Sequence, residues 1–126
     1  MNWISDLLSA FAHSLGMDQI PMGSNGQATL EFENGQRLYF EVMPSGVGVS
    51  LVYHSDGYQL LKEIRTLLEL CHYQNTVQYQ LRPGLIAENV LSVSTTIPQE
   101  KAILSELQSV VEQIQDTMSR VLEQNS

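Results

Sequence analysis

The residues best suited to metal binding in this sequence are its three histidines, His13, His54 and His72. None of them has a second ligand at the short spacing that zinc sites use. His54 and Asp56 lie close together, but two side chains leave a site short of ligands. The sequence therefore predicts no bound metal, and no motif in it predicts another cofactor.

A thiol and an imidazole stand side by side at Cys71 and His72, and such groups can form a nucleophile and its base. Neighbours on a helix point about 100° apart and do not face one another. Cys71 also falls among the apolar positions of an expected helix, where a free thiol usually acts as a small hydrophobic residue. The sequence leaves open whether a histidine distant in the chain approaches this thiol.

Three glutamates, Glu31, Glu33 and Glu41, share the polar phase of neighbouring expected strands. Paired carboxylates can act as general acid and base, but a solvated sheet face gives the same pattern. The glycines of Gly46-Val47-Gly48 precede no helix whose N-terminus could hold a phosphate, so we interpret them as a turn. The sequence therefore predicts no catalytic residues, and we expect a binding protein and no enzymatic activity.

The overall composition limits the partners. The 126 residues carry six Lys and Arg against fourteen Asp and Glu, a formal net charge of -8. Such a surface repels phosphate backbones and anionic lipids, so nucleic acids and membranes are poor partners. A single cysteine allows no internal disulfide, and we find neither a signal peptide nor an apolar run of about 20 residues. We expect one cytoplasmic domain over residues 1–126.

Helical periodicity predicts three helices. Apolar residues recur on one face over residues 2–15, over a segment that follows Gly57 and ends near His72, and over residues 98–123. In the last segment the apolar side chains fall within an arc of about 120°. Pro98 suits the first turn of that helix.

Alternating apolar and polar residues predict five strands, over residues 28–33, 37–43, 47–54, 76–82 and 90–97. Asn34-Gly35 is a strong hairpin signal because both residues tolerate positive φ. Pro44-Ser45-Gly46 and Pro83-Gly84 are expected to turn the chain after the second and fourth strands. The element order α-β-β-β-α-β-β-α predicts an α+β fold that contains an antiparallel meander.

The second helix has a wider apolar arc than contact with one sheet requires. Leu70 extends this arc to nearly half of the helix circumference. A helix of this kind is typically covered on two sides, so the width predicts a subunit interface. The expected interface residues on the helix are Leu60, Ile64, Leu67, Leu68 and Cys71.

Other apolar residues are candidates for an exposed groove. Leu30, Phe32, Leu38 and Phe40 give the first two strands an apolar face, and Trp3 lies near the start of the chain. Most of these side chains are expected in the core. The remainder would suffice for one or two grooves on the surface.

Several stretches of the sequence resemble a known family. They are Met1-Asn2-Trp3-Ile4, Leu15-Gly16, and the segment from Leu81-Arg82-Pro83-Gly84 to Leu91-Ser92-Val93-Ser94. With the element order, the size and the acidic charge, they resemble the class I chaperones of bacterial type III secretion, most of all the SycN-type branch. That branch serves the secretion gatekeeper, the protein that holds back effector export.

The resemblance implies a function in protein export. A chaperone of this family binds the N-terminal region of a secreted protein, gatekeeper or effector, in extended form and keeps it soluble and export-competent without ATP. The first and third helices would pack on a twisted antiparallel sheet. The second helix and the strand near Val77 and Tyr79 would build a two-fold dimer, which is a homodimer or a heterodimer with a second small chaperone. Cargo would bind by strand addition and in apolar pockets, with candidate contacts at Trp3, Leu7, Phe11, Ile20, Met22, Leu30, Phe32, Leu38 and Phe40.

The alternative is a small-ligand or regulatory sensor domain with a pocket between the sheet and the last helix. Such a domain would bind a compound as a monomer, whereas the wide apolar arc of the second helix favours a dimer. A small hydrolase would need a convergent polar cluster, which we do not find in the sequence.

Overall fold

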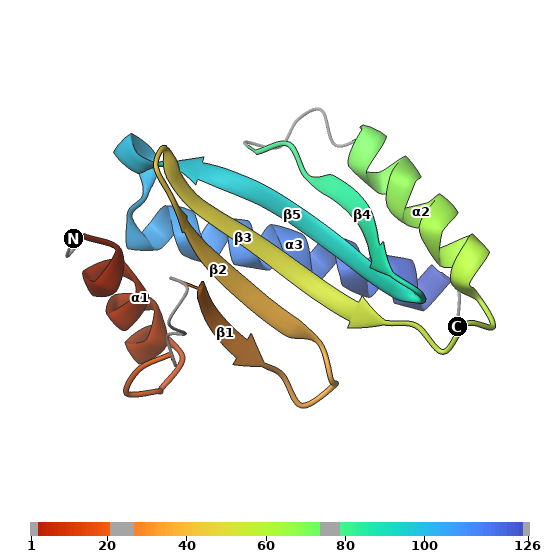
Figure 1. Cartoon of the computed structure of the whole chain (residues 1–126), viewed down its shortest axis with the longest axis horizontal. Coiled ribbons are helices and arrows are strands. Elements are labelled where there is room, and N and C mark those ends of the chain that lie inside the picture. The colour runs from red at the N-terminus through yellow and green to blue at the C-terminus, as the bar shows by residue number, and fades with distance from the viewer. Residues whose placement is uncertain (1–2, 21–26, 74–78, 125–126) are drawn as a thin grey trace.

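The chain folds as a sheet with helices packed on it (Figure 1). The structure is a computed structural model, and it describes residues 3–20, 27–73 and 79–124. Within these residues the elements are α1 (Trp3–Ser14), β1 (Gln27–Glu31), β2 (Arg37–Met43), β3 (Gly46–His54), α2 (Leu60–Tyr73), β4 (Arg82–Ala87), β5 (Val90–Pro98), the 3-10 turn η1 (Gln99–Lys101) and α3 (Leu104–Gln124).

All strand pairs in the five-stranded sheet are antiparallel, and the strands lie in the order β1-β2-β3-β5-β4. The β1–β2 connection contains the expected Asn34-Gly35 turn, in which Gly35 has a φ of 88°. The Asn34 side-chain oxygen accepts a hydrogen bond of 3.0 Å from the backbone N–H of Gln36. The α+β prediction, the element order and the meander of β1, β2 and β3 are therefore confirmed.

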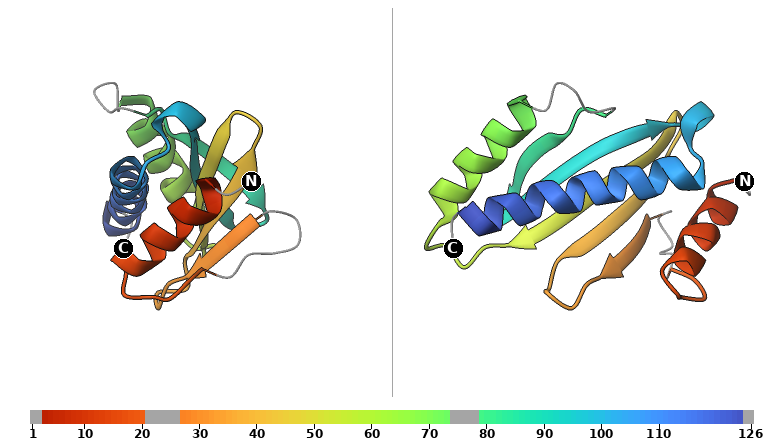
Figure 2. Two further views of the ribbon diagram at one scale, coloured as in Figure 1. Left: turned by 90° about the vertical axis from the view of Figure 1, so that its left-hand side faces the viewer. Right: turned by 180° about the vertical axis from the view of Figure 1, so that it is seen from behind.

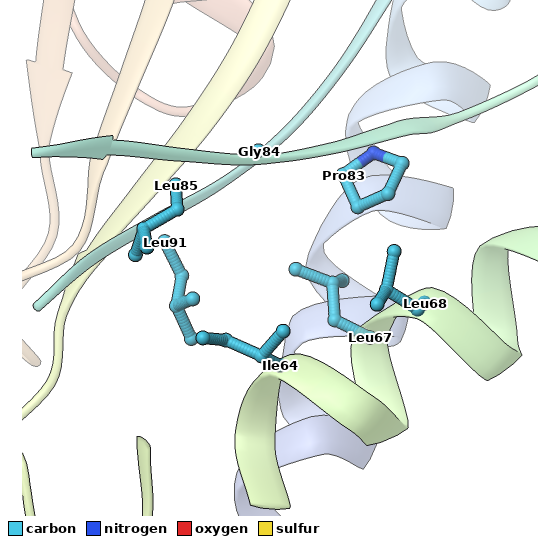
Figure 3. A pocket seen from close by; sticks show the side chains of 7 residues that line it. All are labelled: Ile64, Leu67, Leu68, Pro83, Gly84, Leu85 and Leu91. Atoms are coloured by element: carbon cyan, nitrogen blue, oxygen red, sulfur yellow. The ribbon is translucent and has the colours of Figure 1, made fainter. Parts of the chain in front are cut away.

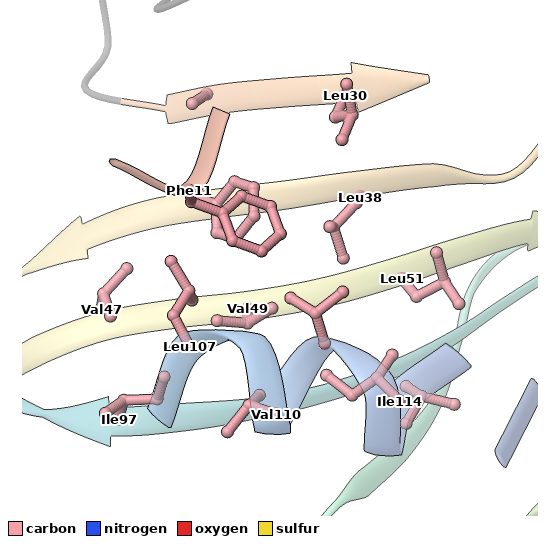
Figure 4. Packing of buried hydrophobic residues seen from close by; sticks show 14 of the residues in the cluster. Phe11, Leu30, Leu38, Val47, Val49, Leu51, Ile97, Leu107, Val110 and Ile114 are labelled. Atoms are coloured by element: carbon pink, nitrogen blue, oxygen red, sulfur yellow. The ribbon is translucent and has the colours of Figure 1, made fainter. Parts of the chain in front are cut away.

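One face of the sheet carries the core. Helices α1 and α3 cover this face, and α2 packs beside α3 and β4 (Figure 2). The strand register aligns apolar side chains in rows that cross the sheet, such as Leu30, Leu38, Leu51 and Val93. The α3 side chains Leu107, Val110 and Ile114 pack over these rows (Figure 4). All three are fully buried, as are Met118 and Val121 of the same helix.

The fourth strand differs from its prediction. It was expected over residues 76–82 with a turn at Pro83-Gly84, but β4 begins at Arg82 and includes both Pro83 and Gly84. Proline lacks a backbone N–H and is tolerated in an edge strand, and β4 is an edge strand of this sheet. Asn89, with a φ of 60°, lies in the turn that leads into β5.

The last helix also begins later than expected, at Leu104 and not at Pro98. Pro98 is the last residue of β5 and pairs with Gly46. Gly46 is the first residue of β3, so this strand begins one residue earlier than predicted. A Cβ atom at Gly46 would overlap the backbone carbonyl of Ile97, so this close pairing requires glycine. The pairing carries β5 through Pro98, and the short turn η1 then leads to α3.

Candidate functional site

An apolar cleft separates α2 from β4 (Figure 3). Its volume is about 220 Å³. Helix α2 supplies three aliphatic side chains, β4 supplies three consecutive residues, and β5 supplies one leucine. The residues lining the cleft are Ile64, Leu67, Leu68, Pro83, Gly84, Leu85 and Leu91.

Large apolar side chains around this cleft are open to solvent. Leu61 is 82% exposed, Leu68 is 52% exposed and Leu85 is 54% exposed. Leu61 and Leu68 are seven residues apart, which places them on the same face of α2. Isolated exposed leucines are ordinary, but exposed leucines on a helix that also lines an apolar cleft make this region the candidate interaction surface. We call the cleft and these leucines the α2–β4 face.

A buried polar contact holds α2 in place beside this face. The Ser55 hydroxyl donates a hydrogen bond of 2.6 Å to the carboxylate of Glu63, and both residues are buried. The backbone N–H of Ser55 donates to the carbonyl oxygen of Asn89 in the β4–β5 turn at 2.7 Å. Burial, the Glu63 carboxylate and Asp56 together raise the pKa of Tyr53. The start of α2 is thereby tied to the β4–β5 hairpin, and this tie helps to set the width of the cleft.

The predicted interface residues divide into two groups. Ile64, Leu67 and Leu68 line the cleft, and Leu60 is partly buried against the core. Leu67, Cys71 and Tyr79 are buried members of the core cluster and offer little surface to a partner. Val77 lies outside the described residues.

Burial also answers the question of thiol chemistry at Cys71. The apolar surroundings disfavour the thiolate and raise the pKa of Cys71 to about 11. A thiol with this pKa is protonated near neutral pH and is a poor nucleophile. The structure therefore favours the role of Cys71 as a small core residue.

Six of the nine cargo candidates are buried in the core, and five of the six come from α1, β1 and β2. Phe11 and Phe40 pack edge to face, with ring centroids 5.5 Å apart. The five from α1, β1 and β2 are Leu7, Phe11, Leu30, Leu38 and Phe40. These side chains stabilise the contact between α1 and the sheet, so we do not place them in a surface groove.

The other cargo candidates lie near α1 and the β1 end of the sheet. Trp3 and Phe32 are partly buried against the core, whereas Ile20 is buried. Met22 lies outside the described residues. A hollow of about 130 Å³ at α1 is lined by Ser5, Leu8, Ser9, Gln19 and Ile20. Leu15 at the end of α1 is 47% exposed, so this region retains some accessible apolar surface.

Sequence reasoning missed the most exposed residues of the α2–β4 face. Leu61 belongs to the wide apolar arc of α2 and could have been included on that signal. The sequence signal at Pro83-Gly84 predicts a turn, so it predicts no strand for Leu85. The structure places Leu85 on an edge strand, where its side chain stays accessible.

Polar side chains do not assemble into a centre with metal-binding geometry in the described part of the chain. Glu31 contacts Arg37 at 3.8 Å in an exposed ion pair, which is an ordinary surface interaction. Among residues 3–20, 27–73 and 79–124, no helix is both long enough and apolar enough to span a membrane.

Comparisons with known proteins identify the fold. No protein-family model and no curated sequence matches this chain significantly. Among solved structures, it resembles the Yersinia pestis type III secretion chaperone SycH, crystallised with a stable fragment of YscM2. The TM-score is 0.72 at 14% identity, over 93% of this chain and 98% of that chain.

Two further structures share the architecture. The structure of the HopA1–SchA chaperone–effector complex matches with a TM-score of 0.71 at 18% identity, over 97% of this chain and 94% of that chain. YbjN from E. coli, a proposed transcription regulator, matches with a TM-score of 0.59 at 14% identity, over 93% of this chain and 87% of that chain. The chain therefore has the fold found in type III secretion chaperones.

Proposed function

We propose that this protein is a type III secretion chaperone that binds the N-terminal region of a secreted protein and keeps it soluble and export-competent. The observation that carries the proposal is the likeness in fold to SycH and SchA, which extends over 93% and 97% of this chain. In this account residues 1–126 act as one cytoplasmic chaperone domain that needs no cofactor and catalyses no reaction.

Cargo binds in extended form at the α1 and β1 end of the sheet. Strand β1 lies at the sheet edge and is hydrogen-bonded to β2 on one side, so its outer edge can accept an added strand. Trp3, Phe32 and Leu15 supply the accessible apolar surface beside that edge. An unfolded segment loses entropy on binding, and contacts with such side chains offset that loss.

The α2–β4 face is the dimer interface. A stable interface buries about 1,600 Å² in total, and the exposed leucines of this face supply its apolar centre. The partner is a second copy of the chain or a related small chaperone. In a homodimer whose α2 helices pair antiparallel, with Leu61 against the partner's Leu68, the two copies of Arg65 lie close together. Repulsion between these like charges favours the heterodimer.

The proposed cargo is a secretion gatekeeper, as for the SycN-type branch. Support for this narrower assignment comes from the sequence stretches at residues 1–4, 15–16 and 81–94. An effector remains the other cargo class. The two classes differ in the protein that the chain captures, and one experiment compares them.

Co-expression with secreted proteins of the same genome tests the proposal. The chain is expressed with the full-length gatekeeper, with an effector, and with each of these proteins lacking its N-terminal region. We expect the full-length cargo to stay in the supernatant and to co-purify with the chain, whereas the truncated cargo does not. Co-purification that is independent of the N-terminal region, or its absence for every cargo, would contradict the proposal.

A regulatory domain is the second candidate, and the likeness to YbjN favours it. The long helix α3 packs on the sheet with fully buried side chains such as Leu107, Val110 and Ile114, which fill the place expected for a ligand pocket. A regulatory domain would bind a small compound as a monomer. Thermal stabilisation of a monomer by a metabolite library, without cargo binding, would favour this second function.

A further inference from the structure

A polar hollow lies at the sheet edge where β5 continues past the start of β4. Strand β4 begins at Arg82 opposite Ser94, while β5 runs on to Pro98 and η1 (Figure 1). The hollow has a volume of about 520 Å³ and is open to solvent. Its lining residues are Tyr79, Gln80, Arg82, Thr95, Thr96, Pro98 and Lys101.

Two cations of this hollow have no ion pair with any described residue. Arg37 and Arg120 each lie within 4 Å of a carboxylate of the same chain, at 3.8 Å from Glu31 and 3.1 Å from Asp116. In contrast, Arg82 and Lys101 are exposed and contact no carboxylate in the described residues. Lys62 and Arg65 of α2 also contact no carboxylate in the described residues, but Arg82 and Lys101 are the two of the six Lys and Arg that line one hollow.

The neighbouring hydroxyl groups are already hydrogen-bonded within the chain. The Tyr79 hydroxyl donates to Glu106 at 3.3 Å, and the Thr95 hydroxyl donates to the Gln80 carbonyl at 2.9 Å. These contacts fix the walls of the hollow. The side chains of Arg82, Lys101 and Gln80 supply N–H donors that can meet a ligand, and those of Arg82 and Lys101 carry positive charge.

We propose that Arg82 and Lys101 bind a carboxylate-bearing segment of an extended polypeptide. The inference rests on the proposed function only for the origin of that segment, which would be the secreted cargo. A guanidinium and an ammonium group beside one hollow suit the side chains of Asp and Glu. The net charge of -8 opposes the binding of such a segment over the surface as a whole, and the two positive charges of this hollow offset that repulsion locally.

Nuclear magnetic resonance on the purified full chain tests this site without any cargo. An octapeptide of glutamate is titrated into the ¹⁵N-labelled chain at low salt, and an octapeptide of glutamine serves as the uncharged control. We expect saturable shifts of the amide signals of residues 80–82 and 94–101 with the glutamate peptide alone. The double variant Arg82→Gln, Lys101→Gln should weaken binding about fivefold or more.

A matched control removes the same charge elsewhere. The double variant Arg37→Gln, Arg120→Gln should bind the glutamate peptide as the natural chain does, because those cations are already paired. Equal binding by both double variants, shifts centred on α2, or equal binding of the glutamine peptide would overturn the proposal. Tighter binding of inorganic phosphate than of the glutamate peptide would also overturn it, since the hollow would then be a site for a free anion.

These outcomes are distinguishable from failure of the proposed function. If the glutamate peptide does not bind but cargo still co-purifies, the docking site at Arg82 and Lys101 is contradicted and the chaperone function is not. Peptide binding at Arg82 and Lys101 without cargo co-purification would support the site and contradict the chaperone.

Discussion

Burial distinguishes two phenylalanines of the β1–β2 hairpin. Phe40 is buried and packs against Phe11, whereas Phe32 is partly buried at the end of the β1–β2 hairpin. The strand pattern alone could not separate them, because both residues have the apolar phase of their strand. Their difference comes from α1, which covers Phe40.

The substitution Phe40→Ala is expected to lower the free energy of unfolding by about 3–5 kcal/mol, because it opens a cavity in the core. Phe32→Ala should cost less than about 1.5 kcal/mol and should weaken cargo binding by about tenfold. Urea denaturation and cargo titration on the same two variants measure both effects. If Phe32→Ala unfolds the chain as Phe40→Ala does, Phe32 is an ordinary core residue and not a cargo contact.

The buried thiol of Cys71 makes the stability sensitive to alkaline pH. Burial raises the pKa of Cys71 from the ordinary value of 9.0 to about 11. Between these values an unfolded chain releases the thiol proton while the folded chain keeps it, so rising pH favours unfolding. The stabilising effect is fully present below pH 9 and is lost as the pH approaches 11.

We therefore expect the melting temperature to fall between pH 9 and pH 11, and to fall less steeply in Cys71→Ala. The variant has a lower melting temperature at neutral pH because it loses buried volume. The pKa values of Tyr53 and Tyr79 are also raised, and they contribute equally to the fall in melting temperature of the natural chain and of the variant. Parallel curves for the two proteins would show that Cys71 does not contribute.

At the scale of elements, hydrophobic periodicity predicted every helix and four of the five strands. Strand β2 has its expected bounds, and the Asn34-Gly35 turn directs its pairing with β1. Strand β4 was misplaced because Pro83-Gly84 is a strong local turn signal, and the edge position that tolerates it depends on the whole sheet. The same error concealed Leu85, a residue of the α2–β4 face.

Helix α2 offers the clearest test of the dimer. Leu61 and Leu68 are exposed in the single chain, so Leu61→Glu with Leu68→Glu should change its stability by less than about 1 kcal/mol. If both leucines lie at the centre of the interface, the dissociation constant should rise at least about 100-fold. Sedimentation velocity, alone and with a candidate partner chaperone, measures the change.

The matched control is Ile103→Glu, because Ile103 is 58% exposed but precedes α3 and lies outside the α2–β4 face. This variant should associate as the natural chain does. Equal loss of association in the control would contradict an interface on α2. The same holds if the natural chain sediments as a monomer both alone and with the candidate partner chaperone.

At the scale of the whole molecule, the sequence predicted the fold class better than the binding surfaces. The fold class depends on the composition and element order of the whole chain. A local error, such as the misplaced bounds of β4, therefore does not change the predicted fold class. Which apolar side chains stay exposed depends on how α1, α2 and α3 cover the sheet. For this reason Leu38 and Phe40 were plausible groove residues in the sequence and are core residues in the structure.

Hydrogen–deuterium exchange of the chain, with and without the N-terminal segment of its secreted partner, tests the central claim most directly. The account predicts that bound cargo slows amide exchange in α1 and β1, where apolar contact and strand addition occur, and that the centres of β5 and α3 keep their exchange rates. The account is contradicted if α1 and β1 exchange at the same rate in both samples.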